Sequence, residues 1–197
     1  MSTTIRTTAT KAEQRVPMDS TRKTALVGGA FYVITFAASI PALLLLAPVL
    51  DNPDYIVSSG ADTRVLWGSF LDLVNALACI GSAVALFSVV KRQHEGFALG
   101  FVTSRIVEAV FIVIGVVSLL AVVTLRQAGA AGTDSASLVT VGQSFVTVRD
   151  WTFLLGPTLM AGINALLLGT LMFRSRLVPR VIPVLGLIGA PDRKSVV

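Results

Sequence analysis

Charged and redox-active side chains are scarce in this sequence, and the shortage excludes several classes of protein. Only 14% of the 197 residues are charged, whereas soluble domains carry about 25%. One cysteine, Cys79, is too few for an internal disulfide or a dithiol redox centre. The single histidine, His94, stands beside Glu95, and two neighbouring residues do not make a metal site. We therefore expect no metal and no cofactor.

Catalytic motifs are missing as well. The sequence has no glycine-rich phosphate loop, no serine nucleophile elbow and no HExxH pair. Ser/His/Asp catalysis has no support, because His94 lies outside every long apolar run. The basic residues near the N-terminus are typical of segments that touch anionic lipid rather than nucleic acid. These absences favour a non-enzymatic protein that does not bind nucleic acid, without deciding the question of enzyme activity.

Long hydrophobic runs dominate what remains. Hydrophobic residues make up 54% of the chain, and the mean hydropathy is +0.80. Four runs exceed the roughly 18 residues that indicate a membrane-spanning helix: 25–50, 65–90, 98–125 and 152–173. A fifth run, 181–190, is too short to cross. The sequence thus predicts an all-α protein in the lipid bilayer, a polytopic transmembrane helix bundle with four full spans plus an incomplete fifth.

The segments outside these runs complete the domain organisation. Residues 1–24 predict a disordered basic cytoplasmic tail, and 25–190 a single transmembrane domain. Residues 191–197 are charged and end abruptly, which indicates a truncated or foreign tail. Between the third and fourth runs, 126–150 predicts either a short amphipathic helix on the outer membrane surface, with Asp134 as its N-cap, or a plain connector.

Lysine and arginine are distributed unevenly around the four runs. If the N-terminus is cytoplasmic, the inner segments hold ten such residues: Arg6, Lys11, Arg15, Arg22, Lys23, Lys91, Arg92, Arg174, Arg176 and Arg180. The outer segments then hold three, namely Arg64, Arg126 and Arg149. Because cytoplasmic loops carry the excess of positive charge, we expect a multi-pass protein of the cell membrane with a cytoplasmic N-terminus.

The third run, 98–125, contains two charges that lie three residues apart on one helical face, Arg105 and Glu108. Arg105 is close enough to the inner interface to snorkel there, and we expect it to do so. Glu108 lies about 15 Å deep, near the midplane of a ~30 Å hydrocarbon core, and has no route to water. It is either a hydrogen-bonded packing residue or a functional proton or cation site.

Other polar residues in the runs extend this candidate site. The second run carries one small and polar face, of the kind that packs against other helices: Gly68, Asp72, Asn75, Cys79 and Ser82. By depth, Thr35 and Asn164 match Glu108, whereas Tyr32 matches Arg105. Asp72 lies nearer the outer side, where it can reach water or a loop. The candidate intramembrane polar site comprises Glu108, Arg105, Asn75, Asn164, Asp72, Thr35 and Tyr32, with Glu108 expected to pair with Asn75, Asn164 or Thr35.

Three functions are compatible with these features. The leading interpretation is a non-enzymatic membrane accessory or interaction protein, which acts with a membrane protein partner or as a homo-oligomer. The alternative is a small ion- or proton-coupled transporter that uses Glu108 and Arg105. The third is an intramembrane lipid-modifying enzyme, for which Asp72 and Glu108 are the only candidate acid/base pair.

Several stretches resemble a known family. They are PDYI at 53–56, GADTRV at 60–65, RIVEA at 105–109, DWTFLLGP at 150–157 and SRLVPR at 175–180. Together they resemble a family of uncharacterised bacterial integral membrane proteins, known by a domain of unknown function (domain of unknown function 4386). The resemblance implies six helices with both ends cytoplasmic, so this sequence would stop inside the fifth helix. It implies no activity and no site residues.

Overall fold

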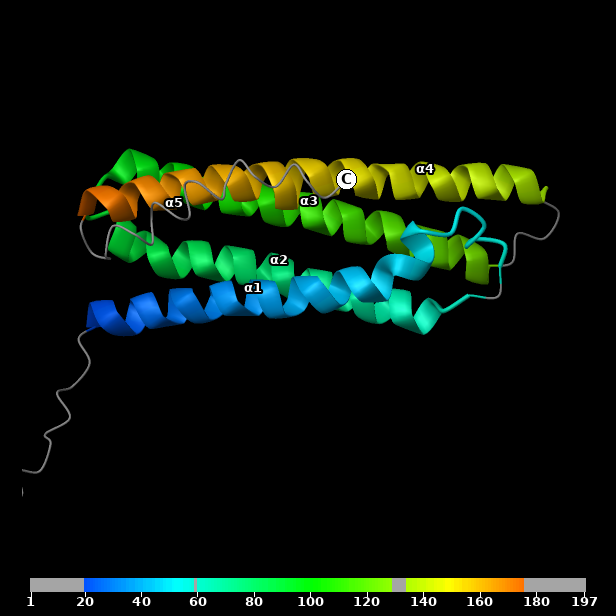
Figure 1. The fold of residues 1–197 in the computed structure, drawn as a ribbon, viewed down its shortest axis with the longest axis horizontal. Helices are drawn as coiled ribbons and strands as arrows, with labels where there is room; N and C mark the ends of the chain where they lie inside the picture. Colours follow the sequence, from blue (N-terminus) through cyan, green and yellow to red (C-terminus); the bar gives the residue numbers. More distant parts are fainter. Residues whose placement is uncertain (1–19, 59, 129–133, 176–197) are drawn as a thin grey trace, which may run out of the picture.

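The computed structural model describes residues 20–58, 60–128 and 134–175, and every regular element in these ranges is helical (Figure 1). The elements are α1 (Ser20–Leu50), α2 (Asp62–Val90), α3 (Glu95–Gln127), α4 (Ser135–Phe153), a π-helix η1 (Leu154–Met160) and α5 (Ala161–Ser175). The expectations for residues 1–19, for the fifth run at 181–190 and for the tail at 191–197 lie outside the described residues.

Four of the described helical segments are long and apolar enough to cross a membrane, so the chain is a multi-pass membrane protein. This confirms the all-α transmembrane bundle. The helices are longer than the apolar runs, because polar residues extend them at their ends: α1 begins at Ser20 rather than at 25. Pro41 and Pro48 lie inside α1 without ending it, which is common in membrane helices.

The fourth span differs most from the expectation. Elements α4, η1 and α5 follow one another without a break and form one long rod (Figure 1), of which 39 residues, Ser135–Phe173, count as one candidate span. The prediction of a short helix on the outer membrane surface within 126–150 is therefore wrong. Residues 135–150 are helical, but the helix continues into the bundle. Its start was predicted correctly, because the Asp134 carboxylate accepts the Ser137 N–H at 3.4 Å.

The π-helix has a local cause. Pro157 lies in its middle, where proline supplies no N–H and its ring clashes with the carbonyl four residues earlier. A wider turn relieves this clash, and such turns occur frequently at functional sites.

The helices pack in a layered order, with α2 and α3 in the middle, α1 against α2, and the rod against α3 (Figure 1). Small residues let these helices approach one another. A Cβ on Gly68 would meet the Leu46 side chain at 2.8 Å, and one on Gly156 would meet Phe111 Cβ at 2.6 Å. The expected small and polar face of α2 is buried throughout, from Gly68 to Ser82.

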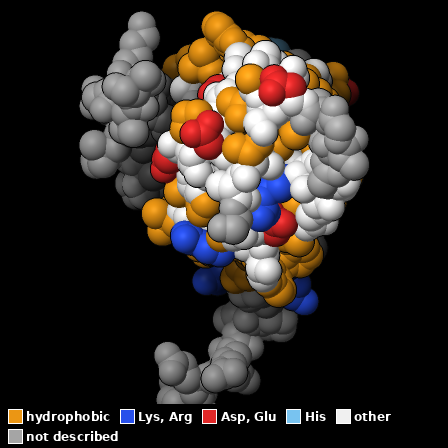
Figure 2. Space-filling model, turned by 90° about the vertical axis from the view of Figure 1, so that its right-hand side faces the viewer, with side chains coloured by type: hydrophobic (Ala, Val, Ile, Leu, Met, Phe, Trp, Pro, Cys, Tyr) orange, Lys and Arg blue, Asp and Glu red, His pale blue; other side chains and the backbone are white. Residues whose placement is uncertain are grey.

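One end of the bundle is closed by a cluster around the loop between α1 and α2. The Tyr55 hydroxyl donates to Asp62 Oδ1 at 2.7 Å, and Arg126 forms an ion pair with the same carboxylate. Arg126 also donates from Nε to the Ser58 carbonyl at 2.8 Å. Figure 2 shows this end of the molecule, where acidic and basic side chains lie among hydrophobic ones. These contacts tie the loop to α2 and α3.

Candidate functional site

The first buried charge pair lies in α3. Arg105 and Glu108 form an ion pair, with Nη1 2.9 Å from Oε2. The two residues are only 4% and 6% exposed, so the protein covers both side chains almost completely. Their spacing of three residues places them on one helical face, so the geometry follows directly from the sequence.

Neighbouring helices hydrogen-bond to this pair. The Asn164 amide of α5 donates to Glu108 Oε2 at 2.6 Å, and its Oδ1 accepts from the Ser104 hydroxyl. On the other side, Arg105 donates from Nε and Nη2 to Ser82 Oγ at 3.2 and 3.0 Å. The Arg105 guanidinium also lies over the Tyr32 ring of α1, 4.6 Å from its centroid. The pair thus joins α1, α2, α3 and α5.

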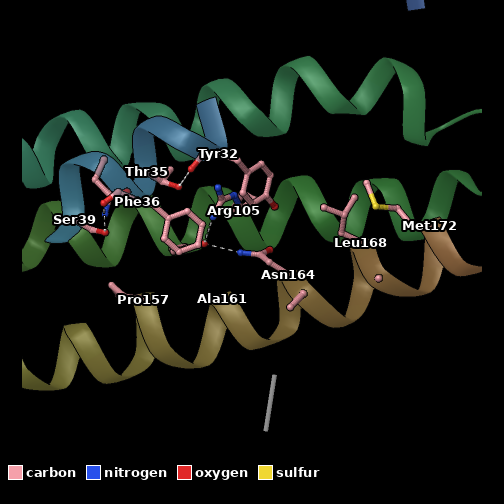
Figure 3. A pocket seen from close by; sticks show the side chains of 14 residues that line it. Tyr32, Thr35, Phe36, Ser39, Arg105, Pro157, Ala161, Asn164, Leu168 and Met172 are labelled. Atoms are coloured by element: carbon pink, nitrogen blue, oxygen red, sulfur yellow. Dashed lines mark hydrogen bonds and ion pairs between the residues drawn. The ribbon is translucent and has the colours of Figure 1, made fainter. Parts of the chain in front are cut away.

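The Arg105–Glu108 pair borders open space. A cavity of about 340 Å³ lies beside it, between α1 and the rod. Figure 3 shows Tyr32, Thr35 and Ser39 of α1 on one side and Pro157, Ala161 and Asn164 of the rod on the other. One water needs only about 10–15 Å³ of such volume, so the cavity has room for several waters or for a small ligand. We call it the Glu108 cavity.

The expectations for this region had mixed outcomes. The contact between Glu108 and Asn164 is confirmed, as is the common level of Arg105 and Tyr32. Thr35 lines the cavity, and its hydroxyl donates to the Tyr32 carbonyl at 2.7 Å. The expected snorkelling of Arg105 is wrong: Glu108, Ser82 and Tyr32 satisfy the guanidinium inside the bundle, so it has no reason to reach for the interface.

A second buried charge pair lies between α2 and α4. Arg149 Nη2 is 3.0 Å from Asp72 Oδ2, and the two residues are 4% and 5% exposed. Asp72 was expected to reach outer water or a loop, and this is wrong because the Asp72 carboxylate is buried and pairs with Arg149 of α4. The Arg149 side chain passes over Gly115 of α3, where a Cβ would meet its Cδ at 2.7 Å. Only a glycine leaves room for it there.

Arg149 is the main residue that the sequence analysis missed, since it was assigned to an outer loop. A signal was available, because small, apolar and polar residues recur on one helical face from α4 into the rod. The members of this buried face are Gly142, Val146, Arg149, Thr152 and Gly156. Their spacings of four, three, three and four are steps of one helical turn, as are the spacings along the buried face of α2.

The Asp72–Arg149 pair lines a second cavity of about 660 Å³, which we call the Asp72 cavity. It adjoins the Glu108 cavity, because Ser39, Asn75 and Pro157 line both. Asn75 thus lies between the two charge pairs, and its Oδ1 accepts a weak hydrogen bond from Cys79 Sγ at 3.9 Å. The π-helix that contains Pro157 stands at the junction of the two cavities.

Both buried pairs are electrically neutral, because the positive charge of the arginine cancels the negative charge of the carboxylate. Each carboxylate is matched by its own arginine, so neither cavity carries net charge from its pair. The structure does not bring Asp72 and Glu108 together as an acid/base pair. Over the described residues, no three His, Cys, Asp or Glu side chains gather in a way that could hold a metal ion.

Comparison with known proteins gives the family. The family model described as a domain of unknown function (DUF4386) matches residues 27–191, and the chain belongs to this family. No curated protein and no solved structure matches the chain. The family carries no assigned activity, so the function must be argued from the two cavities.

Proposed function

We propose that this membrane protein is a small ion- or proton-coupled carrier in which Glu108 is the proton-binding group. The observation that carries the proposal is that the Glu108 cavity borders a buried ion pair. A carboxylate that served only for packing would be enclosed by side chains, whereas Glu108 lines about 340 Å³ of open volume. Buried ionisable residues in a membrane are costly and commonly mark transport pathways.

The geometry suggests how a proton would act. Glu108 holds Arg105 at 2.9 Å and accepts from Asn164 at 2.6 Å. A proton on Glu108 removes the charge that attracts the guanidinium, which leaves Arg105 free to bind an anionic or dipolar group of a solute. Loss of the proton restores the ion pair and displaces that group. One protonation event would thus exchange a closed charge pair for a solute-binding arginine.

The proposal includes an orientation in the cell membrane. The N-terminus and the loop between α2 and α3, with Lys91 and Arg92, face the cytoplasm, while the loop between α1 and α2 faces out. Moving Arg149 into the bundle reduces the outer count of lysine and arginine from three to two, and the inner count stays at ten. The bias toward a cytoplasmic N-terminus therefore increases.

Proton coupling can be measured in liposomes that contain the purified protein and the pH-sensitive dye pyranine. Sodium or potassium chloride added outside should acidify the lumen with the wild type, because the chloride that binds Arg105 would enter together with the proton on Glu108. The Glu108→Gln variant keeps the size and the hydrogen-bonding capacity of the side chain but cannot bind a proton, so its luminal pH should stay constant. Thr140→Ala, a change on the exposed surface of α4, is the matched control.

Two results would contradict this function. Wild-type liposomes that show no more proton movement than empty ones with either chloride salt would remove the support for proton-coupled transport. A Glu108→Gln variant that moves protons as fast as the wild type would remove Glu108 from the mechanism.

The second candidate is an accessory protein that docks a partner helix or a second copy of itself. It is favoured by exposed apolar residues of α1 that line neither cavity, Leu26 and Val33, which are 60% and 67% exposed, and α1 packs mainly on α2. Crosslinking through a cysteine at position 33, after Cys79→Ala, tests this candidate. A stable crosslinked species in native membranes would favour it over the carrier.

A further inference from the structure

The Asp72 cavity has the construction of a ligand site of its own. At about 660 Å³ it lies within the ~300–1,000 Å³ of typical small-molecule pockets, which are mostly apolar with a few polar groups. Its floor is polar and buried, because Asp72, Asn75 and Arg149 are only 5%, 7% and 4% exposed. Its rim is apolar and open, because Ile40, Leu43, Leu44 and Phe153 line it and are 40–66% exposed.

The position of this rim determines where a ligand would enter. The exposed lining residues lie on α1 and on the rod, which border the cavity from its two sides. They lie within helices that cross the membrane, so the mouth opens sideways toward lipid acyl chains rather than toward water. A ligand of this cavity must therefore dissolve in the bilayer.

The floor determines which head group fits. Asp72 and Arg149 already neutralise each other, and an added charge would be unpaired in a medium that strongly disfavours it. Spare hydrogen-bonding capacity remains on the pair, since the hydrogen bond between the two residues uses only Nη2 of Arg149 and Oδ2 of Asp72. An uncharged group that both accepts and donates a hydrogen bond complements this floor.

We infer that the Asp72 cavity is a second binding site, for an uncharged single-chain amphiphile whose hydroxyl or protonated carboxyl group hydrogen-bonds to the Asp72–Arg149 pair from the cavity side. The chain of the ligand lies along the apolar rim of α1 and Phe153. The site is separate from the proposed proton-binding role of Glu108, because binding here requires no transport and no proton movement.

Fluorescence quenching by brominated lipids tests the site. The reporter is Phe153→Trp with Trp67→Phe and Trp151→Phe, in lipid nanodiscs, and the probe is a long-chain alcohol brominated along its chain. Val117→Trp in the same background is the matched control, since Val117 is 60% exposed and outside the cavity lining. Quenching should saturate at position 153 and rise linearly at position 117. If Phe153→Trp does not fold, Leu43→Trp reports from the opposite rim.

The head group and the charge pair are tested in the same assay. A brominated alkane of equal length, which has no hydroxyl, and a brominated phospholipid should quench position 153 without saturation. The double variant Asp72→Leu/Arg149→Met should weaken binding of the alcohol at least about tenfold, the factor that corresponds to 1.4 kcal/mol, while melting like a folded protein.

Each contrary result overturns the site. Linear quenching by the alcohol at position 153 would mean that the alcohol reaches this position only from the surrounding bilayer and does not bind in the cavity. Equal saturation by the alkane shows that the polar floor is not used. Undiminished affinity in the folded double variant removes Asp72 and Arg149 from recognition. All of these results leave the proton assay on Glu108 unaffected, so the two proposals fail separately.

Discussion

The two buried charge pairs resemble each other in chemistry and differ in how the chain makes them. Arg105 and Glu108 lie three residues apart on α3, so their contact needs only that helix. Asp72 and Arg149 are 77 residues apart, on α2 and α4, and meet only when the bundle is assembled. The first pair is local and is surrounded by hydrogen bonds from neighbouring helices. The second is itself the link between two helices.

This difference predicts unequal energetic roles. If one partner of the local pair is lost, the other keeps several contacts: Arg105 still has Ser82 and the Tyr32 ring. If Arg149 is lost, Asp72 loses the one side-chain partner that is shown for it. The pair that bridges two helices should therefore be the more sensitive of the two to single substitutions, and the following measurements test this ranking.

Arg149→Met should have the largest effect. It leaves Asp72 buried without its counterion, a situation that costs about 3–5 kcal/mol in the free energy of unfolding. Adding Asp72→Leu removes the orphaned charge, and such replacements of a whole buried pair are often neutral or stabilising. Thermal melting in detergent should rank the single variant far below the wild type, with the double variant restored. A double variant as unstable as the single one would mean that Arg149 acts through its packing over Gly115.

Glu108→Ala should have a smaller effect on the free energy of unfolding, about 1–3 kcal/mol. The reason is that the Asn164 amide and Arg105 Nη1 lose the carboxylate to which they donate. Glu108→Gln keeps an acceptor and should melt close to the wild type. The same detergent melts check both variants. If Glu108→Ala is destabilised more than Arg149→Met, the local pair carries more of the fold and the ranking above is reversed.

The local pair could be predicted from the sequence, whereas the long-range pair could not. Spacing along one helix placed Arg105 beside Glu108, and helix rise placed Asn164 at the depth of Glu108. Asp72 was recognised as a buried-face candidate, but its partner was not, because the polar composition of 126–150 suggested that the chain had left the membrane. The error was to interpret Arg149 by its neighbours in sequence rather than by the helical face that it shares with Gly142 and Gly156.

The cavities also lay beyond sequence reasoning. Their volumes depend on the distance between α1 and the rod. This distance depends on how individual side chains pack, which the periodicity of a sequence does not predict. The π-helix at the junction had a visible cause in Pro157, but a proline inside a membrane helix predicts a local change without saying which kind. The number and type of the long helices, by contrast, followed directly from run length, since lipid allows few alternatives.

Gly115→Ala tests the second pair without removing a charge. The new methyl group would meet Arg149 Cδ at 2.7 Å and Thr152 Oγ1 at 2.9 Å, so the arginine must move away from its place beside Asp72. We expect a loss of about 1 kcal/mol, the lower end of overpacking costs. Gly162→Ala in α5 is the matched control, because nothing lies within 4 Å of its added Cβ, and it should be neutral or slightly stabilising. Equal melting temperatures for the two variants would show that the contact over Gly115 is not tight.

The smallest effect is expected outside the membrane, at the cluster that closes the loop end, and it should depend on pH. Burial, together with the hydrogen bond to Asp62, raises the pKa of Tyr55 from 10.0 to about 12. A raised pKa means that the folded state favours the protonated phenol. The stabilisation that the neutral phenol gives the folded state is therefore complete below pH 10 and is lost as the pH rises toward 12. Tyr55→Phe removes the hydroxyl and should cost about 0.5 kcal/mol at neutral pH, the lower end of the range for one hydrogen bond, because Arg126 still pairs with Asp62. Melting curves between pH 8 and pH 12 should show the wild type losing this advantage over the variant at the alkaline end.

Because Arg126 and Asp62 hold the same loop, the variant should remain folded throughout. A constant difference between the two proteins across this range would mean that the phenol does not ionise before the bundle unfolds, and that the cluster acts by packing alone.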